Sequence, residues 1–213
     1  MTTKLINEIE ALKKSLVKKT IECRLREFGC FRHKSTKEWF SELCFCLLTA
    51  NSKAQTAIQI QKDLGATGFC HACFDDVRQC IITNKHRFHN NKSKYIVEAR
   101  AHIDIKEKIT DIVLYDGEKE AREWLVKNIK GLGYKEASHF MRNVGYTKLA
   151  ILDRHILRLM HECGYIKTIP KTLSKNIYLE IEKKFNNIAK KFDMNSAELD
   201  LYMWYLKTGK ILK

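Results

Sequence analysis

The sequence predicts an all-α fold, and three observations support that class. Helix start signals recur along the chain, among them two matches to the capping box, Ser35-x-x-Glu38 and Ser52-x-x-Gln55. Apolar residues repeat at helical spacing, and several of these runs end at a glycine, which is common at helix C-termini. Strand-like alternation is scarce, and Pro170 is the single proline.

The expected helices follow one another along the chain. The first 19 residues are amphipathic and rich in lysine, and they predict one helix. A core helix is expected after the first capping box, and a second helix after the other box, ending at Gly65. Helical spacing predicts further helices over 95–103, 121–129, 137–144, 153–163, 177–192 and 195–206.

The chain is strongly basic. Its 213 residues include 39 Lys and Arg against 25 Asp and Glu, which gives a formal net charge of +14. So cationic a surface repels itself unless an anionic partner lies against it; nucleic acid is the first candidate and a membrane surface the second. The longest apolar run, Leu43 to Leu48, is far shorter than the about 20 residues of a membrane span. The sequence therefore favours a nucleic-acid partner and no membrane.

The eight cysteines are expected to stay reduced in a cytoplasmic protein, because the N-terminal segment does not resemble a signal peptide. Cys70-His71-Ala72-Cys73 is the one cluster that suggests a metal site. Zinc needs four ligands, and Cys80 and His86 do not complete a second pair at ligand spacing. We therefore interpret the cluster as a cysteine-rich turn between helices and expect no metal and no cofactor.

A glycine-containing turn stands out in the segment NIKGLGYKEASHFMRNVGY, residues 128–146. Gly131, Leu132 and Gly133 separate two expected helices, which predicts a helix-hairpin-helix. Free amides at the start of the second helix lie at the positive end of its dipole, where they suit a phosphate oxygen. An ordinary tight turn between packed helices would contain the same glycines.

Lys135 follows this turn, in the first turn of the second helix, where the helix dipole disfavours a cation. A lysine whose ammonium form is disfavoured can act as an amine nucleophile. Asp153 comes eighteen residues later, after one helix and a loop, a separation that allows its carboxylate to approach the amine. Asp153 is also a suitable N-cap for the helix that follows it, and the two roles are compatible.

One further segment, His86-Arg87-Phe88, lies in an otherwise polar loop. Arg87 and Phe88 are candidates for a wedge that inserts beside the bases of the nucleic-acid partner. Phe88 would otherwise be an aromatic side chain that covers the core.

The hairpin GLGYKEA, followed at this distance by ILDRHILR, resembles the helix-hairpin-helix DNA glycosylase superfamily. With EWFSELCFCLLTAN, IPKTLS and ELDLYMWYLKTGKILK, the resemblance runs nearly end to end and is to the archaeal-type, or second-type, 8-oxoguanine DNA glycosylase/lyase family. It implies two helical subdomains with the hairpin at their interface and no β domain. The implied division is 1–30 with 136–213 and 31–135, the hairpin covering about 119–145.

The resemblance also implies site residues. Lys135 is implied as the nucleophile and Asp153 as the assisting carboxylate, while the tail makes Trp204 a stacking candidate and the carboxylate of Lys213 an acceptor for the guanine edge. One departure is visible: the loop 146–152 lacks the Gly and Pro of the superfamily. Endonuclease III-like and adenine-mismatch relatives carry four closely spaced cysteines after the aspartate, whereas Cys163 alone follows it here, so no iron–sulfur cluster is expected.

The function that follows is bifunctional base excision from double-stranded DNA containing 8-oxoguanine, by a monomer that also nicks the strand through a lysine Schiff base. A glycosylase for another oxidised base, or a hairpin module that only binds DNA, remain alternatives. The second of these leaves Lys135 and Asp153 unexplained.

Overall fold

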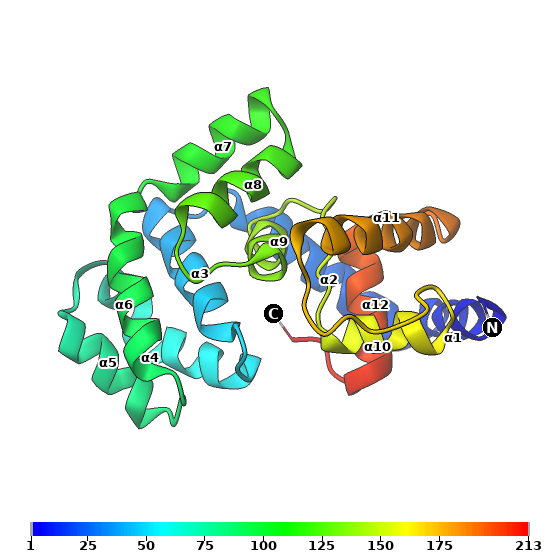
Figure 1. Ribbon diagram of the computed structural model, residues 1–213, viewed down its shortest axis with the longest axis horizontal. Helices are drawn as coiled ribbons and strands as arrows, with labels where there is room; N and C mark the ends of the chain where they lie inside the picture. Colours follow the sequence, from blue (N-terminus) through cyan, green and yellow to red (C-terminus); the bar gives the residue numbers. More distant parts are fainter. Residues whose placement is uncertain (1, 213) are drawn as a thin grey trace. The chain divides into compact units, whose positions relative to one another are not determined.

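The computed structural model describes residues 2–212, with their side chains from residue 4 onward. These residues form twelve α-helices and one 3₁₀ helix and contain no strand, which confirms the predicted all-α class (Figure 1). The elements are α1 (Thr2–Lys13), α2 (Leu16–Phe31), α3 (Thr36–Thr49), α4 (Ala54–His71), α5 (Phe74–Thr83), α6 (His89–Ala99), η1 (Arg100–His102), α7 (Ile105–Tyr115), α8 (Glu118–Asn128), α9 (Tyr134–Asn143), α10 (Arg154–Glu162), α11 (Lys175–Lys191) and α12 (Ser196–Thr208).

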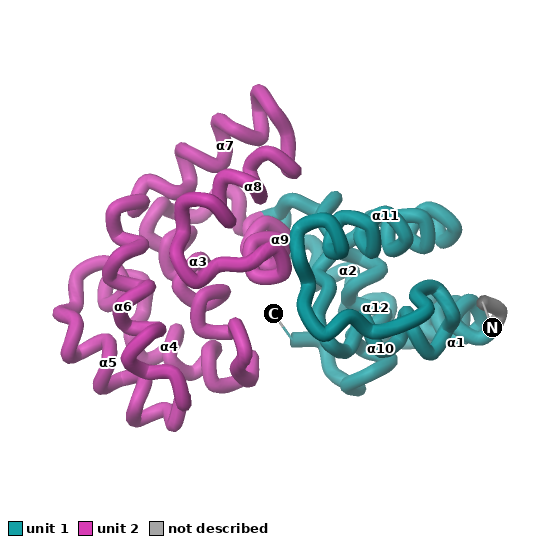
Figure 2. The backbone as a smooth tube through the Cα atoms, viewed as in Figure 1, with its two compact units in different colours: residues 1–30, 145–213 teal, residues 31–144 magenta. Residues whose placement is uncertain are grey.

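The helices group into two compact units (Figure 2). One contains residues 1–30 and 145–213, and the other contains residues 31–144. The sequence analysis draws the subdomain boundary after residue 135, whereas α9 groups with residues 31–144 because it packs against α3 and α8. Both helices of the hairpin, α8 and α9, therefore belong to one unit.

Helix α3 is the core of the unit 31–144. Every residue from Trp39 to Thr49 is buried, and α3 packs against α4, α6, α7 and α9. Its predicted capping box is confirmed: the Glu38 amide donates to Ser35 Oγ at 3.3 Å, and the Ser35 amide donates to Glu38 Oε2 at 2.9 Å. The backbone bond from Ser35 lowers the pKa of Glu38. A rigid, buried α3 fixes the position of the helices around it.

The second predicted capping box is wrong. Helix α4 begins at Ala54, and its N-cap residue, Lys53, makes no side-chain capping bond. The Ser52 amide donates to Thr49 O at 3.1 Å, so this serine belongs to the turn that ends α3. The predicted stop at Gly65 is a kink, with φ 61° and ψ 177°, after which α4 continues to His71.

Other boundaries also differ from the expectation. The predicted N-terminal helix is two helices, because Ser15 Oγ accepts from the Val17 amide at 3.2 Å and starts α2. The predicted helix 95–103 tightens into the 3₁₀ helix η1 after Ala99. Helices α5 and α7 were not predicted.

The Cys70–Cys73 segment is the turn between α4 and α5. Cys73 is the N-cap of α5 and its sulfur accepts from the Asp76 amide at 3.4 Å, while Cys70 is buried. Among the residues that the structure describes, no three His, Cys, Asp or Glu side chains are arranged to hold a metal ion. The capping bond of Cys73 and the burial of Cys70 agree with the predicted turn between helices.

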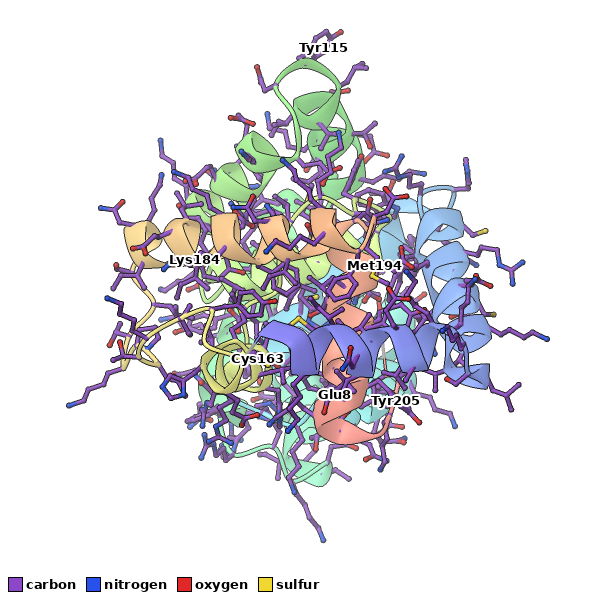
Figure 3. All side chains as sticks on the ribbon, turned by 90° about the vertical axis from the view of Figure 1, so that its right-hand side faces the viewer. Glu8, Tyr115, Cys163, Lys184, Met194 and Tyr205 are labelled. Atoms are coloured by element: carbon purple, nitrogen blue, oxygen red, sulfur yellow. The ribbon has the colours of Figure 1, made fainter. Side chains whose placement is uncertain are left out.

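In the unit formed by 1–30 and 145–213, α1, α10 and α11 pack against α12. The α12 residues Leu199, Leu201 and Met203 are buried there. Lys184 lies on the exposed side of α11 and pairs with Glu180 at 2.9 Å (Figure 3). None of the helices described is long and apolar enough to cross a membrane.

Candidate active site

The predicted hairpin is present, with α8 and α9 joined by residues 129–133. Gly131 has φ 86°, a left-handed conformation that favours glycine. A Cβ at this position would also overlap the ring of Tyr95 on α6. Leu132 is only 5% exposed, so its side chain anchors the turn in the core. Glycine at 131 is thus required by both conformation and packing.

The amides that suit a phosphate are those of the first turn of α9. The N-cap is Gly133, which has no side chain to cap the helix, whereas the N-caps Ser35, Asp153 and Asn195 use their side chains. The first N–H groups of a helix have no intrahelical acceptor. The Leu132 amide, by contrast, already donates to Ile129 O at 3.2 Å. Of the predicted hairpin residues, Gly133 therefore lies closest to the amides available to an anion.

Lys135 lies one residue into α9, and its side chain is 25% exposed. Its Nζ is 3.2 Å from Oε1 of Glu136, whose side chain is 14% exposed. A charged partner that close holds the amine in one place beside the hairpin turn. Sequence reasoning did not single out Glu136, because an acidic residue in the first turn of a helix is common for electrostatic reasons alone.

A second lysine lies near this pair. Lys92 on α6 is 5% exposed, and its Nζ donates to Leu47 O at 2.6 Å, near the C-terminus of α3. The Nε2 of His86 bonds the neighbouring carbonyl, that of Leu48, at 3.0 Å. Burial lowers the pKa of Lys92 to about 8 and also lowers the pKa of His86. The side chains of His86, just before α6, and Lys92, in its first turns, thus hydrogen-bond to backbone carbonyls at the end of α3.

The predicted wedge residues extend from this attachment. Arg87 donates to Asn51 O at 3.2 Å, and its guanidinium lies 4.4 Å from the centre of the Phe88 ring. Both side chains are exposed, Phe88 by 36%. The exposure argues against Phe88 as a cover for the core and is compatible with the wedge role, which stays a prediction.

Asp153 lies in the other unit and is the N-cap of α10, as predicted. Its Oδ1 accepts from the Ile156 amide at 2.8 Å. This bond accounts for one carboxylate oxygen and fixes the direction of the side chain. Capping thus orients the carboxylate that the resemblance implies as catalytic.

The loop before Asp153 has no Gly or Pro, and side chains of α11 fix its path instead. The hydroxyl of Tyr178 donates to Ala150 O at 2.7 Å and accepts from the Leu152 amide at 3.3 Å. Oε1 of Glu182 accepts from the Ala150 amide at 3.0 Å. Tyr178 and Glu182 are buried, so these bonds are shielded from water. The two residues hold the backbone of a loop that lacks the Gly and Pro of the superfamily. Nothing in the sequence around either residue indicated this role.

Trp204 lies on α12 in the same unit as Asp153. It is partly exposed, whereas its neighbour Tyr202 is buried. Its ring meets that of His155 on α10 edge to face, with centroids 5.0 Å apart. This contact helps to position the indole, and its use as a stacking platform stays a prediction. Lys213, the other predicted pocket residue, lies outside the described residues.

The predicted site residues therefore divide between the two units. Gly131, Leu132, Gly133, Lys135, Arg87 and Phe88 belong to the unit 31–144, and Asp153 and Trp204 to the unit formed by 1–30 and 145–213. Lys135 follows a hairpin suited to phosphate, and the helix that Asp153 caps orients its carboxylate, which agrees with the site that the resemblance implies; the roles of both residues stay predictions.

Comparison with known proteins agrees with these features. A family model described as 8-oxoguanine DNA glycosylase matches residues 21–194, which include the hairpin, Lys135 and Asp153. The chain belongs to the 8-oxoguanine DNA glycosylase family. The matched residues include parts of both units, and Trp204 lies beyond them.

Relatives within the 8-oxoguanine DNA glycosylase family match the chain along almost its whole length. The 8-oxoguanine DNA glycosylase/AP lyase of Methanocaldococcus jannaschii is 50% identical over 209 residues, covering 98% of this chain and 99% of that protein. The structure of the M. jannaschii enzyme with a 15mer DNA containing 8-oxoguanine has a TM-score of 0.95 and covers 99% of this chain and 100% of that one. The Thermotoga maritima 8-oxoguanine DNA glycosylase is 38% identical, with a TM-score of 0.92 and full coverage of both chains.

Proposed function

We propose that this protein is a bifunctional 8-oxoguanine DNA glycosylase and abasic-site lyase. The observation that carries the proposal is a lysine in the first turn of the hairpin's second helix, in a chain that matches glycosylase/AP lyases along its length. The related structure that contains an 8-oxoguanine DNA 15mer supports damaged DNA as the partner. The protein acts as a monomer in the cytoplasm, on double-stranded DNA, and needs neither a membrane nor a cofactor.

The hairpin binds the DNA backbone. One phosphate oxygen accepts from the first-turn amides of α9, a contact that is independent of base sequence. The charge of +14 supplies the general attraction for the duplex. The lesion is then extruded from the stack, because the glycosidic bond cannot be reached inside it. Arg87 and Phe88 fill the gap that the lesion leaves.

Lys135 performs the covalent step. The lone pair of its neutral Nζ attacks C1′ of the deoxyribose, and the bond from C1′ to the base breaks with its electron pair leaving on the base, which takes up a proton. The sugar opens to a Schiff base on Nζ. Loss of a proton from C2′ then expels the 3′ phosphate by β-elimination and nicks the strand.

Asp153 stabilises the positive charge that develops on the sugar as the base departs, and its carboxylate assists removal of the lysine's proton. Trp204 stacks on the flipped base, and the terminal carboxylate of Lys213 accepts from the guanine edge. Extension of the chain beyond Lys213 tests the last assignment, because undiminished excision by the extended protein would exclude that carboxylate.

The proposal is tested with a duplex that carries one 8-oxoguanine. Excision and nicking are measured in single turnovers for the wild type, Lys135→Gln, Asp153→Asn and the control Lys130→Gln, an exposed hairpin lysine that pairs with Glu98. We expect Lys135→Gln to abolish both reactions with DNA binding intact, and Asp153→Asn to slow them far more than it weakens binding. Excision that survives in Lys135→Gln would refute the nucleophile, and binding without excision by the wild type would leave a hairpin DNA-binding module.

A further inference from the structure

The first turn of α9 lacks the side-chain cap that other helices of this chain use. Ser35, Asp153 and Asn195 each accept from the amide three residues ahead, at the start of α3, α10 and α12. Gly133 takes this position in α9, with φ −93° and ψ −179°, close to the −89° and −179° of Asp153. The backbone of a capped helix is therefore present, while the amide of Glu136, which a cap would occupy, is left to other acceptors.

Tyr134, the first residue of α9, is held from the side by α8. Its hydroxyl donates to the carboxylate of Glu123, whose two oxygens lie 2.7 and 2.6 Å away. A hydrogen bond to a charged group is stronger than one between neutral groups. Helix α8 also supplies Arg122, whose guanidinium carbon lies 5.3 Å from the centre of the Tyr134 ring. Tyr134 is thus held at both its hydroxyl and its ring.

Arg122 extends this attachment one turn further along α9. It is fully buried, and its Nη1 donates to the hydroxyl of Ser138 at 3.2 Å. Ser138 lies about one helical turn after Tyr134 and is also fully buried. Arg122 therefore contacts two successive turns of α9 from one point on α8. We refer to Arg122, Glu123 and Tyr134 as the hairpin clamp.

We propose that Tyr134 is a positioning residue, which the hairpin clamp fixes so that Lys135 and the α9 amides stay in place without an N-cap side chain. This inference rests on the proposed function of Lys135 as the nucleophile. Tyr134 lies between Gly133 and Lys135, so a shift of its side chain moves the backbone of both neighbours. Attack on C1′ requires the amine to be held within about 0.5 Å of one geometry. A side-chain cap would also stabilise the turn, but it would compete with the phosphate for the amide of Glu136.

The first experiment removes the hydroxyl alone. Tyr134→Phe keeps the ring beside Arg122 and loses the bond to Glu123. In single turnovers at saturating protein, excision of 8-oxoguanine should slow by about tenfold. The affinity for undamaged duplex should change by less than about twofold, because the first turn stays mostly formed. Tyr115→Phe, at a tyrosine of α7 that is 81% exposed, is the matched control and should change neither value.

Hydrogen exchange reports on the first turn directly. The amides of residues 137–140 donate to its carbonyls, as Ala137 does to Gly133 O at 2.9 Å. They should exchange about tenfold faster in Tyr134→Phe and in Glu123→Ala, because loss of a hydrogen bond to a charged group favours local opening. Glu123→Gln keeps an acceptor and should exchange more slowly than Glu123→Ala. The double variant Tyr134→Phe/Glu123→Ala should exchange no faster than Glu123→Ala, since the same bond is lost in both.

Gly133→Ser tests why the turn is held from the side. It completes a Ser-x-x-Glu capping box with Glu136, and Gly133→Ala is the matched control, because both add a Cβ that comes within 3.1 Å of Glu136 Oε2. Gly133→Ser should protect the amides of residues 137–140 about fivefold better than Gly133→Ala. It should nevertheless bind undamaged duplex about fivefold more weakly, since the phosphate must displace the serine hydroxyl. The pair thus separates a well-formed turn from an available amide.

Excision at the wild-type rate by Tyr134→Phe, or binding that weakens in proportion to excision, would overturn the inference. Unchanged exchange in Tyr134→Phe would do the same, as would Gly133→Ser that binds duplex as tightly as Gly133→Ala. Circular dichroism confirms that each variant is folded. A wild type that does not excise 8-oxoguanine would refute the proposed function instead, and hydrogen exchange with the Gly133 pair would still decide whether the hairpin clamp holds the turn.

Discussion

Replacing Gly131 by alanine tests the physical basis of the hairpin. The residue has φ 86°, and strain of a side chain in such a region costs about 1–3 kcal/mol. The added Cβ would also overlap the ring of Tyr95, and overpacking of this kind costs a further 1–3 kcal/mol. Gly131→Ala should therefore lower the free energy of unfolding by about 2–6 kcal/mol. DNA affinity should fall as well, because the turn that presents the α9 amides would shift.

Gly65→Ala provides the matched control. Gly65 lies in the same unit with φ 61°, and no atom lies within 4 Å of the position its Cβ would take. Its substitution should show the backbone strain alone, about 1–3 kcal/mol. Urea denaturation of both variants, and of Gly131→Ala combined with Tyr95→Ala, measures the packing contribution as a coupling energy. Equal losses in the two single variants, with no coupling to Tyr95, would refute the reasoning.

Three further predictions concern stability and the second unit. Lys92→Met should remove a pH dependence of the free energy of unfolding. Burial lowers the pKa of Lys92 from 10.5 to about 8, so between these pH values the folded state binds fewer protons than the unfolded state. The free energy of unfolding of the wild type should therefore rise by about 2 kcal/mol, relative to the variant, from pH 7.5 to 9.5. Urea midpoints at the two pH values check this, and parallel profiles would contradict it. Tyr178→Phe removes two buried hydrogen bonds to the loop before Asp153. We expect the free energy of unfolding to fall by about 1–3 kcal/mol and excision to become slower. Unchanged excision would mean that the loop holds Asp153 in place without these bonds. Ser35→Ala should lower the free energy of unfolding, measured by thermal denaturation, by about 1 kcal/mol, and Ser52→Ala should leave it almost unchanged, because only the first capping box forms. Equal losses in the two variants would contradict the assigned caps.

Helix starts were predictable where a local side chain forms the cap. Ser35, Asp153 and Asn195 each accept from an amide three residues ahead, and the sequence marks all three. Ser52 has the same local pattern, but its amide is used by the turn that ends α3, which only the folded chain reveals. Helix α5 was missed because cysteine is an unusual N-cap. Helix α7 was also missed, and Asp104 before it makes no side-chain capping bond.

The site was predictable only in part. The hairpin glycines and Lys135 lie within five residues of one another, so their relation is visible in the sequence. Lys92 is one of 39 Lys and Arg residues, and nothing in its neighbourhood indicates that it is buried against α3. The same holds for Tyr178, which reaches the loop before Asp153 from a helix that begins more than 20 residues later. Contacts between distant segments decide these roles.

The central claim is that Lys135 forms a Schiff base with damaged DNA. Borohydride trapping on a duplex with one 8-oxoguanine tests it most directly, followed by peptide mapping of the adduct. We predict one covalent adduct on Lys135 that requires the lesion, disappears in Lys135→Gln and persists in Lys130→Gln. An adduct that forms on another residue, or no adduct while the protein binds the duplex, would contradict the account.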